Sequence, residues 1–243
     1  MNQQAESSNQ TRMKRMAANI IIAVAVLIFS RQLWPDFAHF QSREAWSMIL
    51  GYIAFIGIGI TLLIGPLKQW LPTRWTASLL YLRRDIGIWT GAAVFLHVGL
   101  VLVSFENGAR FLFYLDDQQP ATGWIHLFLD QNRGGWSIKI SMMGIANYLG
   151  LIAFCCLLAM WLTSSDRAVR LLGGTAWRRL HVSNPIIFLL VALHGLIYVE
   201  GIKAEPLEAG DLLPLLFVVV LVRTITFIWT VVRSKYSSVK LKR

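Results

Sequence analysis

Three histidines lie in or at the edge of apolar segments that are long enough to cross a membrane. The stretch WRRLHVSNPIIFLLVALHGLIYV, residues 177–199, holds His181 and His194, and an earlier apolar segment holds His97. Ionisable side chains are costly inside a bilayer, so each of them is a candidate functional residue. A neutral imidazole is a common ligand of haem iron and of other metals. Metal binding is therefore the first chemistry that these residues suggest.

The positions of His97 and His194 predict that their rings lie at one level. His97 is eleven residues into its segment and His194 is twelve residues into the other, about 16 and 18 Å from the same side of the membrane. If the two helices are neighbours, the imidazoles face each other across a gap and can ligate one haem iron axially. Nearby Gly91, Gly99 and Gly195 would let a flat cofactor approach the backbone. The alternative is a structural pair that hydrogen-bonds to neighbouring helices.

His181 differs, because it lies at the boundary of its segment beside Arg178 and Arg179. The thirteen residues between His181 and His194 correspond to a rise of about 20 Å, with side chains about 140° apart. A regular helix would therefore not aim both at one partner, although Pro185 can change the local winding.

The residue at the inner level of the other helix, thirteen positions before His97, is Arg84. A second metal site at the level of His181 therefore lacks an obvious second histidine.

The composition indicates a polytopic membrane protein. Of the 243 residues 56% are hydrophobic, and six apolar segments each approach the length of about 20 residues that a crossing needs. We therefore predict an all-α integral membrane protein, a bundle of six transmembrane helices. The segments are Met16–Trp34, Ala45–Ile64, Ile86–Phe105, Ile138–Leu162, Val182–Val199 and Leu212–Val232.

The distribution of charge predicts the orientation of these spans. With the N-terminus inside, 16 of the 23 basic residues face the cytoplasm and ten of the 13 acidic residues lie outside. The positive-inside rule then places both termini in the cytoplasm. The net charge of +10 serves as this orientation signal, so we expect contact with the lipid bilayer and no nucleic acid.

The predicted organisation is a single membrane domain between two tails. Residues 1–15 form a polar and basic cytoplasmic tail, residues 16–232 the six-helix domain, and residues 233–243 a basic cytoplasmic tail. The long connection over residues 106–137 has two aromatic-rich pieces that we expect along the outer interface. No soluble dehydrogenase domain is expected in the chain.

Three motifs resemble a known family. They are LRRDIGIWTGAAVFLH (residues 82–97), LTSSDRAVRLLGGTAWRRLH (residues 162–181) and LHGLIYV (residues 193–199). They resemble the six-helix ferric-reductase-like transmembrane domain, especially its short bacterial branch, the haem-binding membrane subunit of the periplasmic methionine sulfoxide reductase system. The resemblance covers roughly residues 83–199.

The resemblance implies an integral membrane b-type cytochrome that passes electrons across a bacterial inner membrane. By position, His97 and His194 resemble the axial ligands of one haem b, and His181 resembles a histidine that serves a second, inner haem. Arg83 and Arg84 resemble the paired cytoplasmic arginines, and that inner region has been linked to FMN or quinone binding.

Cationic side chains are needed to hold the haem propionates or a flavin phosphate. Arg223, in the sixth span, is one candidate, and its alternative role is pairing with helix carbonyls. The other candidates also fit simple orientation signals or lipid headgroup ligands. They are Arg83, Arg84, Arg178 and Arg179.

The leading hypothesis is a haem subunit that takes electrons from a cytoplasmic flavoprotein or membrane quinol and delivers them to a periplasmic reductase. A second hypothesis is a self-sufficient metalloreductase for ferric or cupric chelates. A third is a haem-free membrane scaffold or assembly factor with structural histidines. The second hypothesis invokes acidic residues that would attract a cation at the outer face, namely Asp116, Asp117, Glu205 and Glu208.

Overall fold

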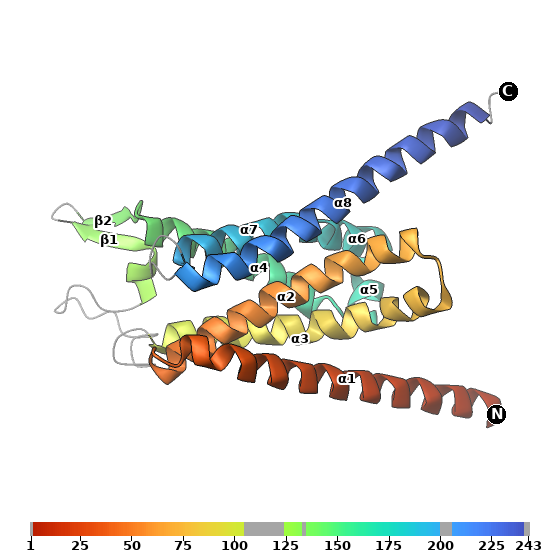
Figure 1. Ribbon diagram of the computed structural model, residues 1–243, viewed down its shortest axis with the longest axis horizontal. Coiled ribbons are helices and arrows are strands. Elements are labelled where there is room, and N and C mark those ends of the chain that lie inside the picture. The colour runs from red at the N-terminus through yellow and green to blue at the C-terminus, as the bar shows by residue number, and fades with distance from the viewer. Residues whose placement is uncertain (1, 105–123, 133–134, 200–205, 241–243) are drawn as a thin grey trace.

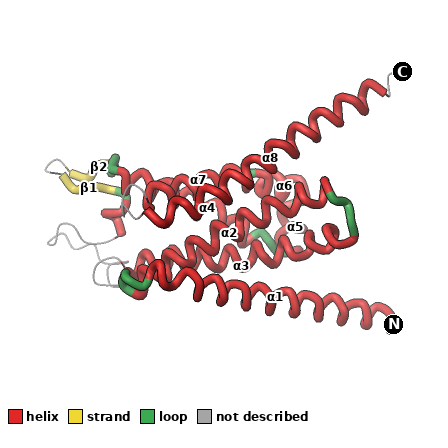
Figure 2. The backbone as a smooth tube through the Cα atoms, in the orientation of Figure 1, coloured by secondary structure: helices red, strands yellow, loops and turns green. Residues whose placement is uncertain are grey.

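The structure is a computed structural model that describes residues 2–104, 124–132, 135–199 and 206–240. Helices dominate these residues (Figure 2). Six helical segments of the described chain are long and apolar enough to cross a membrane, which confirms the predicted fold class. The long helices are α1 (Asn2–Phe37), α2 (Ser42–Trp70), α3 (Arg74–Ser104), α4 (Met142–Leu162) and α8 (Pro206–Lys240), with α6 (Gly174–Val182) and α7 (Asn184–Leu196) forming the fifth crossing together.

Short elements mark the two ends of the bundle. The 3-10 helix η2 (Trp124–Leu127) and the antiparallel strands β1 (Leu129–Asn132) and β2 (Gly135–Ile138) lie at one end, which we call the hairpin end (Figure 1). The helix α5 (Asp166–Leu172) lies with α6 at the other end. The first turn of α1 and the last turn of α8 project beyond this same end.

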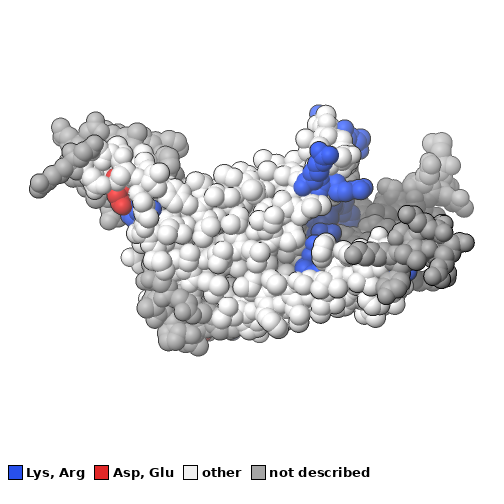
Figure 3. Space-filling view, turned by 90° about the horizontal axis from the view of Figure 1, so that it is seen from above, with Lys and Arg blue, Asp and Glu red and all other residues white. Residues whose placement is uncertain are grey.

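The two ends of the bundle also differ in charge. Figure 3 shows a band of lysine and arginine side chains around the end that carries α5 and α6, which we call the basic end. On the face shown, the opposite end has one small acidic patch with basic atoms beside it. This separation is the pattern on which the predicted orientation depends.

Helix α2 occupies the centre of the bundle. It packs against α1, α3, α7 and α8, while α4 packs against α3 and α7. Large apolar side chains remain exposed on the outer helices, for example Ile21 of α1 at 68% and Phe227 of α8 at 70%. Such exposure is costly in water but favourable against lipid, because the surrounding hydrocarbon is as apolar as the side chains.

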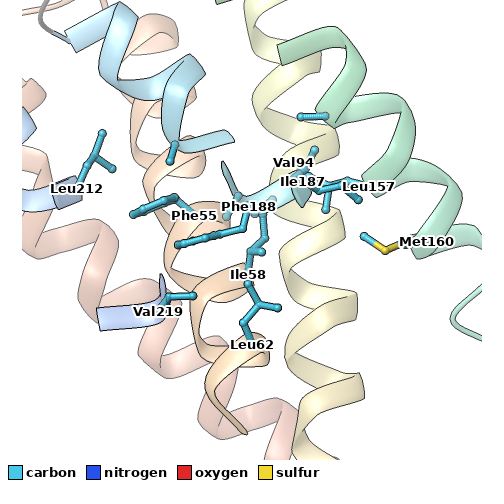
Figure 4. Packing of buried hydrophobic residues seen from close by; sticks show 14 of the residues in the cluster. Phe55, Ile58, Leu62, Val94, Leu157, Met160, Ile187, Phe188, Leu212 and Val219 are labelled. Carbon is cyan, nitrogen blue, oxygen red and sulfur yellow. The ribbon is translucent and has the colours of Figure 1, made fainter. Parts of the chain in front are cut away.

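The core is fully packed in the middle of the bundle. Phe55 of α2 and Phe188 of α7 stack with ring centroids 4.9 Å apart and planes within 9° of parallel (Figure 4). Both are almost fully buried, and Ile58 and Leu62 continue the same cluster along α2. This apolar layer separates His194 from His181, because Phe188 lies between the two histidines along the chain.

Two elements depart from the expected boundaries. Helix α1 begins at Asn2, so the predicted N-terminal tail continues the first span as a helix. The fifth crossing is interrupted at Ser183, where α6 ends and α7 begins with a proline in its first turn. A proline lacks the N–H that would continue the α6 ladder, which explains the break and the altered winding between His181 and His194.

Polar contacts attach α1 to α3 near the basic end. The guanidinium of Arg15 lies 3.2 Å from the buried carboxylate of Asp85, whose side chain is only 5% exposed. Four residues further along α1, Asn19 accepts a hydrogen bond from the indole Nε1 of Trp89 at 2.9 Å. The acidic residue that follows the paired arginines is therefore neutralised by a cation of the first helix.

Candidate functional site

His97 of α3 and His194 of α7 lie next to each other towards the hairpin end. Their ring centroids are 6.4 Å apart, and their planes meet at 80°. Helices α3 and α7 both run from the basic end to the hairpin end, and each histidine lies in the last third of its helix. The structure therefore brings together the two residues whose positions in the sequence suggested one level.

A hydrogen bond from Nδ1 to a backbone carbonyl holds each imidazole. Nδ1 of His97 lies 2.7 Å from the carbonyl oxygen of Ser47 on α2, and Nδ1 of His194 lies 2.8 Å from that of Ala146 on α4. A carbonyl oxygen only accepts hydrogen bonds, so each Nδ1 carries the hydrogen and each Nε2 keeps its lone pair. Histidines that bind metals are commonly oriented in this way through their second ring nitrogen.

The separation of the rings fits one metal ion bound by both. With metal–nitrogen bonds of about 2 Å and ring centres about 1.1 Å beyond the nitrogen, ligands on opposite sides of one ion have centroids about 6 Å apart. The 6.4 Å between His97 and His194 agrees with this value. As whole residues, His97 and His194 are both partly buried.

Two imidazoles are enough for haem, but not for most other metal sites. Across the described ranges, no three or more histidine, cysteine or acidic side chains gather where they could hold a metal ion. In haem the macrocycle supplies four ligands and the protein needs to supply only the axial ones. The residues present therefore fit an axially ligated haem.

A chain of polar contacts connects the His194 side of the pair to the hairpin end. The ring of Tyr198 lies 5.1 Å from that of His194, and its hydroxyl donates to the side-chain oxygen of Asn147. The Asn147 amide in turn donates to the carbonyl of Leu127 in η2 at 2.8 Å. The segment before the hairpin is thereby fixed on α4, beside the residue that holds His194.

His181 lies in a different environment at the basic end. Its ring lies against that of Trp177, with centroids 4.2 Å apart and planes tilted by 32°, and its buried Nε2 makes no hydrogen bond to the described residues. Arg83 lies close enough for its charge to act on His181, and Arg223 lies close enough to act on Arg83. The structure thus brings three of the predicted cationic or titratable residues together from α3, α6 and α8.

This group is remote from the paired histidines. Arg83 precedes His97 by fourteen residues on α3, a rise of about 21 Å. Arg84 also lies at this level, and Arg178 and Arg179 are exposed on α6. The predicted residues therefore divide into a histidine pair towards the hairpin end and a cationic group at the basic end.

The glycines that contact the histidines were not the ones suggested by the sequence. A side chain at Gly91 would meet Trp161, one at Gly195 would meet Leu212, and one at Gly99 would meet nothing within 4 Å. Instead, Gly51 lies against the ring of His97 and Gly150 against that of His194. No signal in the sequence indicated these two, because they lie on α2 and α4 rather than on the helices that carry the histidines.

Several residues that were considered as cation ligands lie outside the described residues. They are Asp116, Asp117 and Glu205, and only the backbone of Glu208 is described. The predicted interfacial pieces over residues 106–137 are described from residue 124 onwards, as η2 and the β-hairpin.

The chain is similar to an MsrQ heme-binding subunit and to two magnetosome proteins named MamZ. The heme-binding subunit MsrQ of the protein-methionine-sulfoxide reductase of Azospira oryzae is 26% identical over 191 residues, covering 77% of this chain and 69% of the relative. The magnetosome protein MamZ of Paramagnetospirillum magneticum is 36% identical over 58 residues, and that of Magnetospirillum gryphiswaldense is 32% identical over 77 residues. These matches cover 24% and 29% of this chain but only 9% and 12% of the MamZ proteins.

A family match covers more than half of the chain and includes His97, one histidine of the pair. Residues 50–193 match the family described as "Ferric reductase like transmembrane component". His194 is the first residue beyond the matched range, at the end of the helix that the match covers. The protein belongs to the family of ferric-reductase-like transmembrane components.

Proposed function

We propose that this protein is the haem-binding membrane subunit of an oxidoreductase system and conducts electrons across the bilayer. The donor is a cytoplasmic flavoprotein or membrane quinol, and the acceptor is a reductase on the outer, periplasmic side. The similarity to a heme-binding subunit over 77% of the chain supports the haem and the link to a methionine sulfoxide reductase system. The family match supports the redox class.

One observation carries the proposal. The rings of His97 and His194 lie 6.4 Å apart, and both present a lone pair at Nε2 because Nδ1 donates to a backbone carbonyl. Two structural histidines would not need the same tautomer or a separation that fits a shared ion. A haem iron bound axially by both imidazoles supplies reversible one-electron chemistry.

The chain's own residues fix the ligands before any cofactor is bound. The carbonyls of Ser47 and Ala146 belong to regular helices, so the direction of each Nδ1 hydrogen bond is set by the backbone of α2 and α4. If His97 and His194 both held one haem iron, the iron would be suited to electron transfer rather than to oxygen binding. The buried Phe55 and Phe188 exclude water from the level below the pair.

The cationic group at the basic end suits the binding of an anionic electron donor. Asp85 is paired with Arg15, and in the described part of the chain no acidic residue forms an ion pair with Arg83 or Arg223. Their charge therefore remains available for an anionic group, such as a flavin phosphate or the propionates of an inner haem. With the basic end in the cytoplasm, the histidine pair lies in the outer half of a bacterial inner membrane.

Vesicles test the proposed conduction. Purified protein is incorporated into lipid vesicles that contain trapped ferricyanide, and dithionite-reduced flavin is added outside. We expect the trapped ferricyanide to be reduced faster than in vesicles without protein. Vesicles with His97→Ala or His194→Ala protein should behave like empty ones. Equal rates with and without the wild-type protein would contradict electron conduction, whatever the haem content.

A further inference from the structure

We propose that Gly51 and Gly150 are positioning residues for the two ligand histidines. Each glycine leaves room for one imidazole to lie against a helix, so that its Nδ1 reaches the carbonyl four residues earlier. The inference rests on the proposed function in that it treats His97 and His194 as haem ligands. It adds two residues, on two helices that carry no ligand of their own.

The contact on α2 shows the arrangement at His97. Nδ1 lies 2.7 Å from the carbonyl oxygen of Ser47. A Cβ placed on Gly51 would lie 3.4 Å from both Nδ1 and Cε1 of the same ring. Ser47 and Gly51 are four residues apart in one helix, so the ring edge lies along a single turn of α2.

The contact on α4 repeats this arrangement at His194. Nδ1 lies 2.8 Å from the carbonyl oxygen of Ala146, four residues before Gly150. A Cβ placed on Gly150 would lie 2.8 Å from both Nδ1 and Cε1 of the ring. The same two ring atoms face the glycine at both contacts, although α2 and α4 are far apart in the sequence.

The geometry of an α-helix explains why a side chain at this position would crowd the ring. The Cα–Cβ bond tilts towards the helix N-terminus, so a side chain covers the turn that precedes its own Cα. A Cβ at position i+4 therefore lies over the carbonyl of residue i, which is the atom that Nδ1 must approach. That carbonyl already accepts the helix hydrogen bond, and its second lone pair accepts the one from the ring.

The two contacts predict effects of different size. At 2.8 Å a Cβ on Gly150 would force the His194 ring to move, because such a distance lies well inside van der Waals contact. At 3.4 Å a Cβ on Gly51 would meet the His97 ring at the edge of ordinary contact. We therefore expect Gly150→Ala to displace its ligand and Gly51→Ala to reorient its ligand slightly.

The experiment compares three purified haem-loaded variants with the wild type. Gly150→Ala and Gly51→Ala alter the two contacts, and Gly65→Ala is the matched control. Gly65 lies on α2, the same helix as Gly51, and a Cβ there would meet nothing within 4 Å. The measurements are haem per chain, electron paramagnetic resonance of the oxidised iron, and monodispersity on size exclusion.

For Gly150→Ala we expect the low-spin signal to fall severalfold relative to wild type, with a high-spin signal in its place. Added imidazole should restore the low-spin state if the ligand was displaced from an otherwise folded chain. For Gly51→Ala we expect a low-spin signal with shifted g values, and for Gly65→Ala the wild-type spectrum.

Two results would overturn the inference. Gly150→Ala and Gly51→Ala could both give the wild-type spectrum, or Gly65→Ala could change it as much as they do. If Gly150→Ala aggregates, the spectrum of Gly51→Ala alone tests the inference, and a wild-type spectrum would overturn it. Wild-type protein without low-spin haem would instead contradict the proposed function as well, so the wild-type sample distinguishes the two failures.

Discussion

The histidines at the two ends of the bundle make different contacts. Towards the hairpin end, His97 and His194 face each other, and each donates from Nδ1 to a helix carbonyl. At the basic end, His181 has Trp177 and the charge of Arg83 as neighbours, and its buried Nε2 makes no hydrogen bond to the described residues. The first arrangement suits an axial ligand pair, and the second suits an anionic partner that arrives from outside the chain.

A histidine in a membrane span is therefore not a metal ligand by its position alone. What distinguishes His97 and His194 is a fixed tautomer and a partner at the same depth, and both depend on residues of other helices. His181 has a cationic neighbour instead, and charge repulsion disfavours a second cation or a bare metal ion at that point. The predictions below separate the two ends experimentally.

Removal of either paired histidine should have the largest effect. His97→Ala and His194→Ala should each abolish the low-spin haem signal, because one axial ligand alone leaves the iron five-coordinate or unbound. His181→Ala is the matched control, since it removes a third intramembrane histidine and should retain that signal. Optical and electron paramagnetic resonance spectra of the purified variants make the comparison. Loss of the signal in His181→Ala alone would reverse the assignment of the two ends.

Loss of one charge at the basic end should have a smaller effect, confined to electron input. Arg83→Gln should slow haem reduction by reduced FMN about tenfold at low salt, because a cationic surface steers anionic reactants. The difference should shrink as salt screens the charge. Stopped-flow rates at several salt concentrations measure this, with Arg170→Gln as the control because Arg170 is exposed on α5. An unchanged rate would show that Arg83 does not receive the donor.

Removal of the Ser47 hydroxyl should have the smallest effect. This hydroxyl lies 3.1 Å from Nδ1 of His97 and donates to the His97 carbonyl at 3.3 Å, but the backbone carbonyl of Ser47 already holds the ring. Ser47→Ala should therefore shift the haem potential by no more than about 40 mV, the one-electron equivalent of a hydrogen bond of about 1 kcal/mol. Potentiometric titration measures the shift. A change of several times this size would mean that the hydroxyl, rather than the carbonyl, orients the ring.

The main features of the fold follow from patterns within single segments. Six apolar runs predict six spans, and the equal depth of His97 and His194 follows from the helical rise of residues within their own helices. Pro185 also indicated altered winding near His181, because the effect of a proline on a helix is local.

Features that depend on contacts between helices could not be predicted. Gly51 and Gly150 contact the histidines only because α2 packs on α3 and α4 packs on α7. A single sequence does not specify which helices pack together. The β-hairpin was missed for a different reason. The letters NRGG at residues 132–135 are typical of a tight turn, but the aromatic residues around them favoured an interfacial interpretation.

The central claim is that His97 and His194 jointly bind one haem. The most direct test is electron paramagnetic resonance of the oxidised wild-type protein, with haem counted per chain in the same sample. We expect a low-spin signal typical of two imidazole ligands, from at least one haem per chain. A colourless protein, or haem whose iron is entirely high-spin, would contradict it.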